Sequence, residues 1–329
     1  MSPRCAQTIR TRVFIWASNG AAKLSGHPNI LRDQFAISLM PQTLITLAQA
    51  TKLRTQRYRH TKLQRLQTPE AIRQFVDDVG LCLLFPAQGL ELPNVYQAVA
   101  GFQKTMTAKH DDAAISLTWS TKDQTLNKRW WYYGKLLKSK ATLVSLDLLP
   151  NFYALSENYG DPDDYLTEYE AGTLSADAKN IYVALLQEGP MHTIDLKRKV
   201  GLYGDAIKSK FDKAILDLQM GLKILPVGVA EAGAWRYAFI YDLLWRWLPK
   251  VPPQAQKITR GDARATILER HLRNVIYATP KELTRIFGWS AKDVQAAVQR
   301  LVDEGSVTMD VTFKGMKETV VLIAQPDGE

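Results

Sequence analysis

A repeated pattern of apolar residues in the C-terminal half constrains the fold of this chain most. Six positions recur at a constant offset of 87 residues, and five further positions recur at a constant offset of 83. The first copy comprises Ala178, Ile181, Leu185, Leu196, Val200, Gly201, Phe211, Ala214, Ile215, Leu218 and Ile224, and the second Ala265, Leu268, Leu272, Leu283, Phe287, Gly288, Val294, Ala297, Val298, Leu301 and Val307. Two constant offsets are hard to obtain by chance, so the pattern predicts two copies of one structural unit.

The first copy contains signals for three helices followed by two strands. Ser175 can cap a helix that ends before Gly189-Pro190, and a short helix from about Thr193 ends at Gly201. A third helix carries the apolar face from Phe211 to Leu218. Residues 222–229 and 234–241 then read as two strands joined by a turn.

The second copy repeats this order. A helix starts at about Asp262, a short helix is capped by Thr279 with Pro280 in its first turn, and a third helix covers residues 290–304. Strands are expected at 306–311 and 318–324. Three helices and a hairpin describe a winged helix, a helix-turn-helix variant whose third helix enters the major groove of DNA.

We therefore predict an α+β fold, mainly α, built from tandem winged helix-turn-helix domains at residues 171–248 and 261–329. A Pro-rich linker at 249–260 separates them. A third winged-helix-like unit is expected at residues 51–170, where no constant offset reveals it. Residues 1–50 are expected to form a basic leader, either disordered or partly the product of a start codon assigned too early.

The formal net charge of +9 is concentrated in the first 69 residues, which hold eleven Lys or Arg and one acid, Asp33. The remainder holds 31 bases and 32 acids, so it is nearly neutral. The leader can be a phosphate-gripping arm, an Arg-rich transit peptide or upstream sequence preceding a true start at Met40. The acid-free basic stretch of Lys52, Arg54, Arg57, Arg59, Lys62 and Arg65 remains in all three cases and is the better candidate for a phosphate-binding arm. The alternative for this stretch is a solvated helix face.

Several other classes of protein are disfavoured. Two cysteines, Cys5 and Cys82, are too few for a disulfide framework, and the five histidines lack metal-ligand spacing, so neither a metal nor a cofactor is predicted. No apolar run is long enough for a membrane span. A cytoplasmic location follows as an expectation.

The candidate DNA-binding residues come mainly from the third helix of each copy. Burying Phe211, Ile215 and Leu218 leaves Lys208 at the helix start and directs Lys210 and Lys213 outwards. Lys292, Gln295 and Gln299 face outwards in the second copy. Lys can contact phosphate or guanine and Gln can pair with adenine, although solvated helix faces have similar compositions.

A run of bases and aromatic residues provides a further candidate surface. Lys128 and Arg129 precede Trp130-Trp131-Tyr132-Tyr133, and Lys135 follows. Such runs are typical of surfaces that stack unpaired bases. On a helix, however, four consecutive aromatic residues point several ways, so at least two of them are expected in the core.

Residues 67–325 resemble the AlkZ/YcaQ superfamily, and more closely its AlkZ-related branch. The resemblance rests on the segments Val79–Pro86, Tyr132–Leu137, Leu155–Pro162 and Ile224–Gly228, with Ala234–Tyr237, which contains the further DNA-binding candidate Arg236. It implies three tandem winged helices curved around duplex DNA. It also implies kinship with DNA glycosylases that unhook interstrand crosslinks or excise alkylated bases.

The chain departs from that superfamily at the catalytic signature, a Gln-apolar-Gln or Gln-apolar-Asp triplet. The corresponding position is occupied by Cys82, Leu83 and Leu84. Breaking an N-glycosidic bond builds positive charge on the sugar, and neither leucine nor a buried thiol stabilises it well. Gln88 and Glu91 are the weaker candidates for replacing the missing polar groups.

Three functions follow as hypotheses. The leading one is a duplex-DNA-binding protein, associated with repair or regulation, without the standard catalytic motif. The second is an active DNA glycosylase with a non-standard site, and the third is a protein-interaction scaffold.

Overall fold

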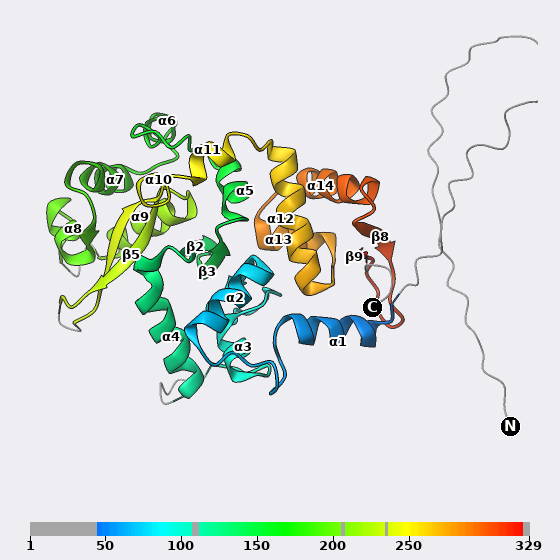
Figure 1. The fold of residues 1–329 in the computed structure, drawn as a ribbon. Helices are drawn as coiled ribbons and strands as arrows, with labels where there is room; N and C mark the ends of the chain where they lie inside the picture. The colour runs from blue at the N-terminus through cyan, green and yellow to red at the C-terminus, as the bar shows by residue number, and fades with distance from the viewer. Residues whose placement is uncertain (1–44, 107–111, 205–207, 234–235, 325–329) are drawn as a thin grey trace, which may run out of the picture. The chain divides into compact units, whose positions relative to one another are not determined.

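The computed structural model describes residues 45–106, 112–204, 208–233 and 236–324, all within one unit that extends from Ile45 to Glu329. Its helices are combined with small three-stranded sheets, which is an α+β architecture (Figure 1). The expected disorder of residues 1–50 falls mostly outside the described residues. The first helix, α1 (Leu47–Arg57), begins inside that leader, at a capping box formed by Thr46 and Gln49.

Three segments share one order of elements: a helix, a short strand, two helices and a two-stranded hairpin. The first segment contains α2 (Pro69–Val79), β1 (Leu81–Leu83), α3 (Val95–Ala100), α4 (Ala113–Thr125), the 3-10 helix η1 (Leu126–Lys128), β2 (Trp131–Leu137) and β3 (Lys140–Ser145). Its sheet has the order β1-β3-β2 and antiparallel pairing. The hairpin strand β3 therefore lies in the centre of the sheet.

The middle segment repeats this order with α7 (Ala176–Glu188), β4 (Met191–His192), α8 (Thr193–Lys199), α9 (Lys208–Met220), β5 (Ile224–Ala230) and β6 (Ala238–Leu243). The third contains α12 (Arg260–Val275), β7 (Tyr277–Ala278), α13 (Pro280–Phe287), α14 (Ala291–Asp303), β8 (Val307–Val311) and β9 (Val320–Ile323). Their sheets have the orders β4-β6-β5 and β7-β9-β8. The segments thus share one sheet topology.

The predicted helices of both copies are confirmed, and their caps explain where they begin. The hydroxyls of Ser175, Thr279 and Ser290 each accept a backbone N–H in the first turn of the following helix, and Thr279 forms a capping box with Glu282. The hairpins are confirmed as well; β6 begins at Ala238, and residues 234–235 of its expected span lie outside the described residues. The two-residue strands β4 and β7 were not predicted, because two residues carry no alternating pattern.

The apolar core joins the three segments. One cluster of buried residues takes Leu81 and Tyr132 from the first segment, Leu225 and Val227 from the middle one, and Ile267 from the third. The expected linker, residues 249–260, contains the helix α11 (Val251–Ala255). The side chains of Val251 and Ala255 belong to the same cluster, so this Pro-rich stretch packs on the core through α11, while Lys250 and Lys257 are exposed.

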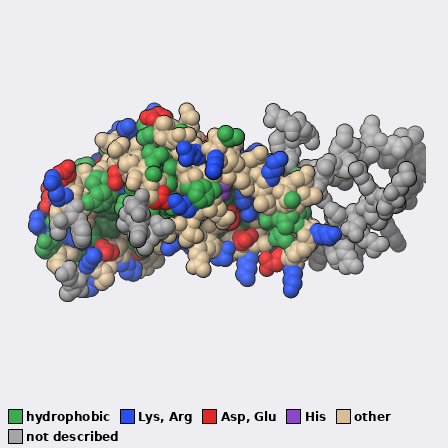
Figure 2. Space-filling view, turned by 90° about the horizontal axis from the view of Figure 1, so that it is seen from below, with side chains coloured by type: hydrophobic (Ala, Val, Ile, Leu, Met, Phe, Trp, Pro, Cys, Tyr) green, Lys and Arg blue, Asp and Glu red, His purple; other side chains and the backbone are tan. Residues whose placement is uncertain are grey.

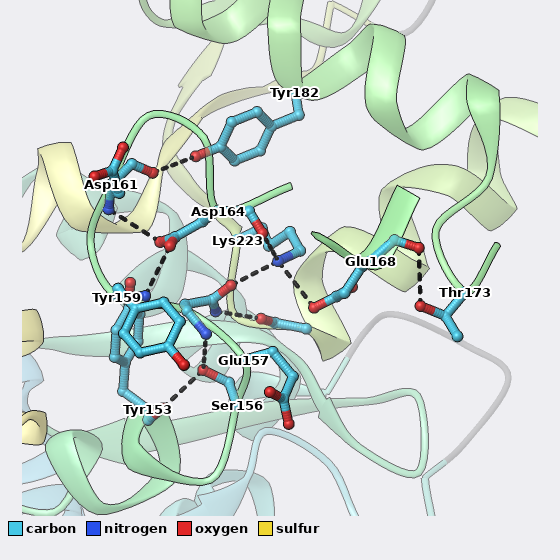
Figure 3. Close-up of polar contacts among 12 residues, drawn as sticks. Tyr153, Ser156, Glu157, Tyr159, Asp161, Asp164, Glu168, Thr173, Tyr182 and Lys223 are labelled. Atoms are coloured by element: carbon cyan, nitrogen blue, oxygen red, sulfur yellow. Dashed lines mark hydrogen bonds and ion pairs between the residues drawn. The ribbon is translucent and has the colours of Figure 1, made fainter. Parts of the chain in front are cut away.

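A loop after α5 (Leu149–Ala154) connects the first segment to the middle one through buried polar groups (Figure 3). The carboxylate of Asp164 accepts the backbone N–H groups of Tyr159, Gly160 and Asp161 at 2.8, 2.8 and 3.1 Å. The buried amine of Lys223 donates to Asn158 Oδ1 at 2.6 Å and pairs with Glu168, in α6 (Leu166–Glu170), at 3.0 Å. The motif Leu155–Pro162 therefore has a structural role here.

The remaining helix, α10 (Leu244–Trp247), follows directly after β6. None of the helices in the described part of the chain is long and apolar enough to cross a membrane.

Candidate nucleic-acid interface

The residues that the sequence resemblance places at the catalytic triplet, Cys82 to Leu84, lie in the core. Cys82 belongs to β1 and is fully buried, and Leu84, directly after that strand, is 3% exposed. Both side chains belong to an apolar cluster that includes Phe75, Tyr96 and Tyr133. Burial raises the pKa of the Cys82 thiol far above its usual range, so the group stays protonated and uncharged. Cys82 and Leu84 therefore offer no charged or strongly polar group that could stabilise a cationic sugar.

A buried lysine and several aromatic rings lie beside this cluster. Lys122 Nζ, on α4, is 4.8 Å from the ring centre of Phe239 and 5.6 Å from that of Tyr133, and both rings pack against the cluster containing Cys82. The amine donates to Tyr237 Oη at 2.8 Å and pairs with Asp123 at 2.6 Å. Burial lowers the pKa of Lys122, and Asp123 opposes this effect.

This lysine group connects the first segment to the hairpin of the middle one, because Tyr237 also donates to Asp123 Oδ1 at 2.8 Å. Sequence reasoning did not find it. Lys122 is the one cation of α4, but its partner Tyr237 lies 115 residues away, and no local pattern joins them.

The two weaker catalytic candidates lie on the loop after the triplet. Gln88 is exposed, whereas Glu91 lines a polar pocket of about 480 Å³ together with Arg54, Tyr58, His60 and, among others, Arg285. Arg54 Nη1 lies 3.9 Å from Glu91 Oε2. Burial lowers the pKa of His60 to about 4, so its imidazole is neutral at pH 7. Neither Cys82 nor Leu84 lines this pocket.

The middle segment presents a basic concave surface beside the predicted DNA-binding residue Lys208. A cleft of about 590 Å³ lies between α8, the start of α9 and the hairpin turn. It is lined by His192, Ile194, Asp195, Lys197, Arg198, Tyr203, Lys208, Ala232 and Gly233. The predicted residue Lys208 is thus brought together with Lys197, Arg198 and the exposed ring of Tyr203, which sequence reasoning missed. The available signal was the run Lys197-Arg198-Lys199 in the last turn of α8.

Some of these cations are already paired and others are not. Arg198 lies 3.4 Å from Asp195, Lys213 lies 2.7 Å from Asp217, and Arg236 pairs with Glu231. Within the described residues, Lys197, Lys208 and Lys210 form no ion pair. Lys197 Nζ lies 4.8 Å from the ring centre of Phe211. Cations without an ion pair can neutralise phosphates without first giving up an internal carboxylate, so these three are the stronger phosphate-binding candidates.

The other predicted DNA-binding residues lie apart from this cleft. Lys292 and Gln295 are exposed on α14, where Gln295 lines a mainly apolar pocket of about 520 Å³, and Gln299 donates to Asp303 at 2.8 Å. Lys128 Nζ lies 4.6 Å from the ring centre of Trp130, and the guanidinium of Arg129 lies 4.2 Å from that of Trp247. Lys135 is exposed on β2. Figure 2 shows basic side chains in separate groups on the face in view, with acidic side chains between them.

The aromatic run does not form a stacking surface. Trp131, Tyr132 and Tyr133 belong to β2 rather than to the expected helix, and all three are buried. Aromatic residues suit a half-buried strand, which is why the run pairs with β3. Only Trp130 is partly exposed, and Lys128 covers it.

No group of three His, Cys, Asp or Glu side chains that could hold a metal ion occurs in the part of the chain that the structure describes. The described residues thus provide two features to compare with known proteins: the basic cleft of the middle segment and the buried segment Cys82–Leu84.

Comparison with known proteins shows the family to which the chain belongs and a solved structure that it resembles. A family model described as "AlkZ related" matches residues 66–288, about two thirds of the chain. No curated protein matches. Among solved structures, the chain is similar to the Streptomyces sahachiroi DNA glycosylase AlkZ, with 10% sequence identity and a TM-score of 0.54. The similarity covers 85% of this chain and 70% of that one, and at this identity it establishes a shared fold.

Proposed function

Because the chain belongs to the AlkZ-related family, we propose that it binds duplex DNA through tandem winged helices and lacks the glycosylase chemistry of the standard triplet. Each of the three segments with a shared element order forms one winged helix in this proposal. The protein acts in the cytoplasm as a repair-associated or regulatory DNA binder.

The observation that carries the proposal is the basic cleft of the middle segment. In a winged helix, the third helix and the hairpin are the parts that meet DNA. Here the start of α9 and the hairpin turn line one cleft with Lys197 and Lys208, and neither lysine is neutralised by a described acid. These positions suit contacts to the phosphate backbone, which position a protein on DNA without reading its sequence.

The triplet supports the second part of the proposal. Preorganised polar groups of the kind that a glycosylase triplet supplies are each worth roughly 10²- to 10³-fold in rate. Cys82 and Leu84 are buried among apolar side chains and uncharged, so they supply no such stabilisation.

A salt titration of DNA binding tests the proposal. Fluorescence anisotropy with a duplex of about 20 base pairs would compare the affinity of the wild-type chain with that of the K197Q/K208Q/K210Q variant between about 50 and 200 mM salt. Over roughly this range, the affinity of a protein that makes six to ten phosphate contacts changes by about 10³- to 10⁵-fold. If the three lysines contact phosphates, the logarithmic salt slope falls by about 0.9 for each phosphate that the variant no longer neutralises.

The K250Q/K257Q variant is a control, because both lysines are exposed and lie outside the cleft. It should retain the wild-type slope. Absence of binding by the wild-type chain at 50 mM salt would refute the proposed function, because binding driven by phosphates strengthens as salt falls and about 50 mM is the lowest concentration of the titration.

A second candidate is an active glycosylase that uses Glu91, favoured by the position of this carboxylate in a polar pocket. Release of an abasic product from alkylated duplex by the wild-type chain, and its loss in the Glu91→Gln variant, would support this alternative. A wild-type chain that yields no product above a buffer control excludes it.

A further inference from the structure

A second pocket is lined by three guanidinium groups and no carboxylate. It has a volume of about 500 Å³ and lies between the end of α1, the turn that follows, α12 and β9. Its lining residues are Leu53, Gln56, Arg57, Arg59, Gln64, Arg273, Ile276, Ile323 and Ala324. Two carboxamides and three arginines thus provide the polar lining, which is a composition suited to an anion.

The arginines are held on a packed support. Ala50 and Leu53 of α1 pack in the core cluster that contains Leu272 and Val275 of α12, so the two helices are fixed against each other. Arg59 follows the C-cap of α1 with φ 59°, a left-handed conformation that glycine adopts more readily at this position. The chain therefore leaves the helical path of α1 at this point, and Arg59 lines the pocket.

The acids near these arginines leave part of their charge uncompensated. Arg57 and Arg59 share one carboxylate, that of Asp78, at 3.9 and 2.9 Å. Arg273 pairs at 2.6 Å with Glu269, one turn earlier on α12. None of these acids lines the pocket. The carbonyl ends of α1 and α12 add roughly half a negative charge each, less than three guanidiniums carry.

The hydrogen-bonding capacity of Arg57 is also incompletely used. Its Nη2 donates to Asn274 Oδ1 at 3.2 Å, whereas its Nε is buried without a hydrogen-bond partner in the described part of the chain. Burial lowers the pKa of Arg57, Asp78 opposes this, and the neighbouring Arg59, Arg270 and Arg273 lower it further. The guanidiniums repel each other, and an anion between them would relieve that repulsion.

We propose that the pocket lined by Arg57, Arg59 and Arg273 binds a phosphate oxyanion. Guanidinium groups match phosphate oxygens with paired N–H donors, and the amides of Gln56 and Gln64 can add further donors. The phosphate belongs either to the DNA backbone, in which case the inference rests on the proposed function, or to a free phosphorylated ligand. Arg57 and Arg59 precede residue 66, so they lie outside the region that the family model matches.

Two binding measurements on the full chain test this inference and separate the sources. The first follows thermal unfolding with and without pyrophosphate, and the second measures anisotropy with duplex DNA. Both compare the wild-type chain with the R57Q/R59Q and R273Q variants and with the charge-matched control K250Q/K257Q. R273Q removes only an exposed pair within one helix, so it should fold even if the double variant does not.

Because the pocket holds one phosphate group, binding of backbone phosphate predicts that R273Q and R57Q/R59Q each weaken DNA binding and lower the salt slope by at most about 0.9, while the control has no effect. Binding of a free phosphorylated ligand predicts that pyrophosphate raises the Tm of the wild-type chain and not that of the arginine variants. If pyrophosphate leaves the wild-type Tm unchanged and the variants bind DNA with the wild-type slope, the inference is wrong. If the wild-type chain binds no DNA but a pyrophosphate shift depends on these arginines, the proposed function fails and the anion site stands.

Discussion

His271 makes the stability of the third segment depend on pH. It lies on α12, fully buried, and neither ring nitrogen has a hydrogen-bond partner in the described part of the chain. Its ring packs edge-on against Phe287, with 5.3 Å between the ring centres. Burial, and to a lesser extent the charge of Arg54, lower its pKa from 6.5 to about 3. The folded protein therefore keeps this imidazole neutral.

The sign and size of the effect follow from that pKa. Because the folded pKa lies below the unfolded value, the unfolded chain takes up the proton first as pH falls. Stability is therefore fully present above pH 6.5 and is lost between 6.5 and about 3. At pH 5, about 1.5 units below the unfolded value, the loss is about 2 kcal/mol at 1.36 kcal/mol per unit.

Urea unfolding at pH 7 and pH 5 would measure this loss. The His271→Leu variant removes the titrating group and fills the site with an apolar side chain of similar size. The difference in unfolding free energy between the two pH values should shrink by about 2 kcal/mol in the variant. An unchanged difference would show that His271 titrates normally in the folded state, as a solvated imidazole does.

Three further predictions concern stability and reactivity. Gly160→Ala should lower the free energy of unfolding by about 1–3 kcal/mol. The reason is that Gly160 has a φ of +85° and that a Cβ at this position would lie 2.5 Å from Pro252 Cβ. An unchanged Tm would contradict this prediction. Thr279→Ala should cost about 1 kcal/mol through removal of the capping box of α13, measured by urea unfolding, whereas a Thr279→Ser control should retain most of the stability. In a Cys5→Ser background, Cys82 should react with a thiol reagent only after denaturation, because it is fully buried; rapid labelling of the native chain would refute its burial.

Much of the fold could be predicted from the sequence because its signals are local. Caps such as Ser175, Thr279 and Ser290 mark helix starts through one side chain and the next turn of backbone. Because the same local signals occur twice at constant offsets, the sequence also predicts two copies of one unit. The first segment has the same order of elements and the same sheet topology, but its core residues follow no constant offset, so only the structure shows the match.

The features that the sequence did not predict correctly depend on contacts between residues that are distant in sequence. The expectation that at least two rings of the aromatic run lie in the core is confirmed, but pairing with β3 makes Trp131 to Tyr133 a strand and not a helix. Lys122 and Tyr237 meet across 115 residues, and Arg57 and Arg273 line one pocket although they lie on α1 and α12. The basic stretch Lys52–Arg65 was recognised as a phosphate-binding candidate, but the residue that completes its pocket could not be identified from sequence.

Hydrogen–deuterium exchange of the full chain, with and without saturating duplex DNA, tests the central claim most directly. If the cleft of the middle segment binds the phosphate backbone, backbone amides of α8 and the first turns of α9 should exchange more slowly in the complex. The buried strand β1, with Cys82, should show no DNA-dependent change. Protection confined to residues outside the middle segment, or no protection at any DNA concentration, would contradict the proposed mode of binding.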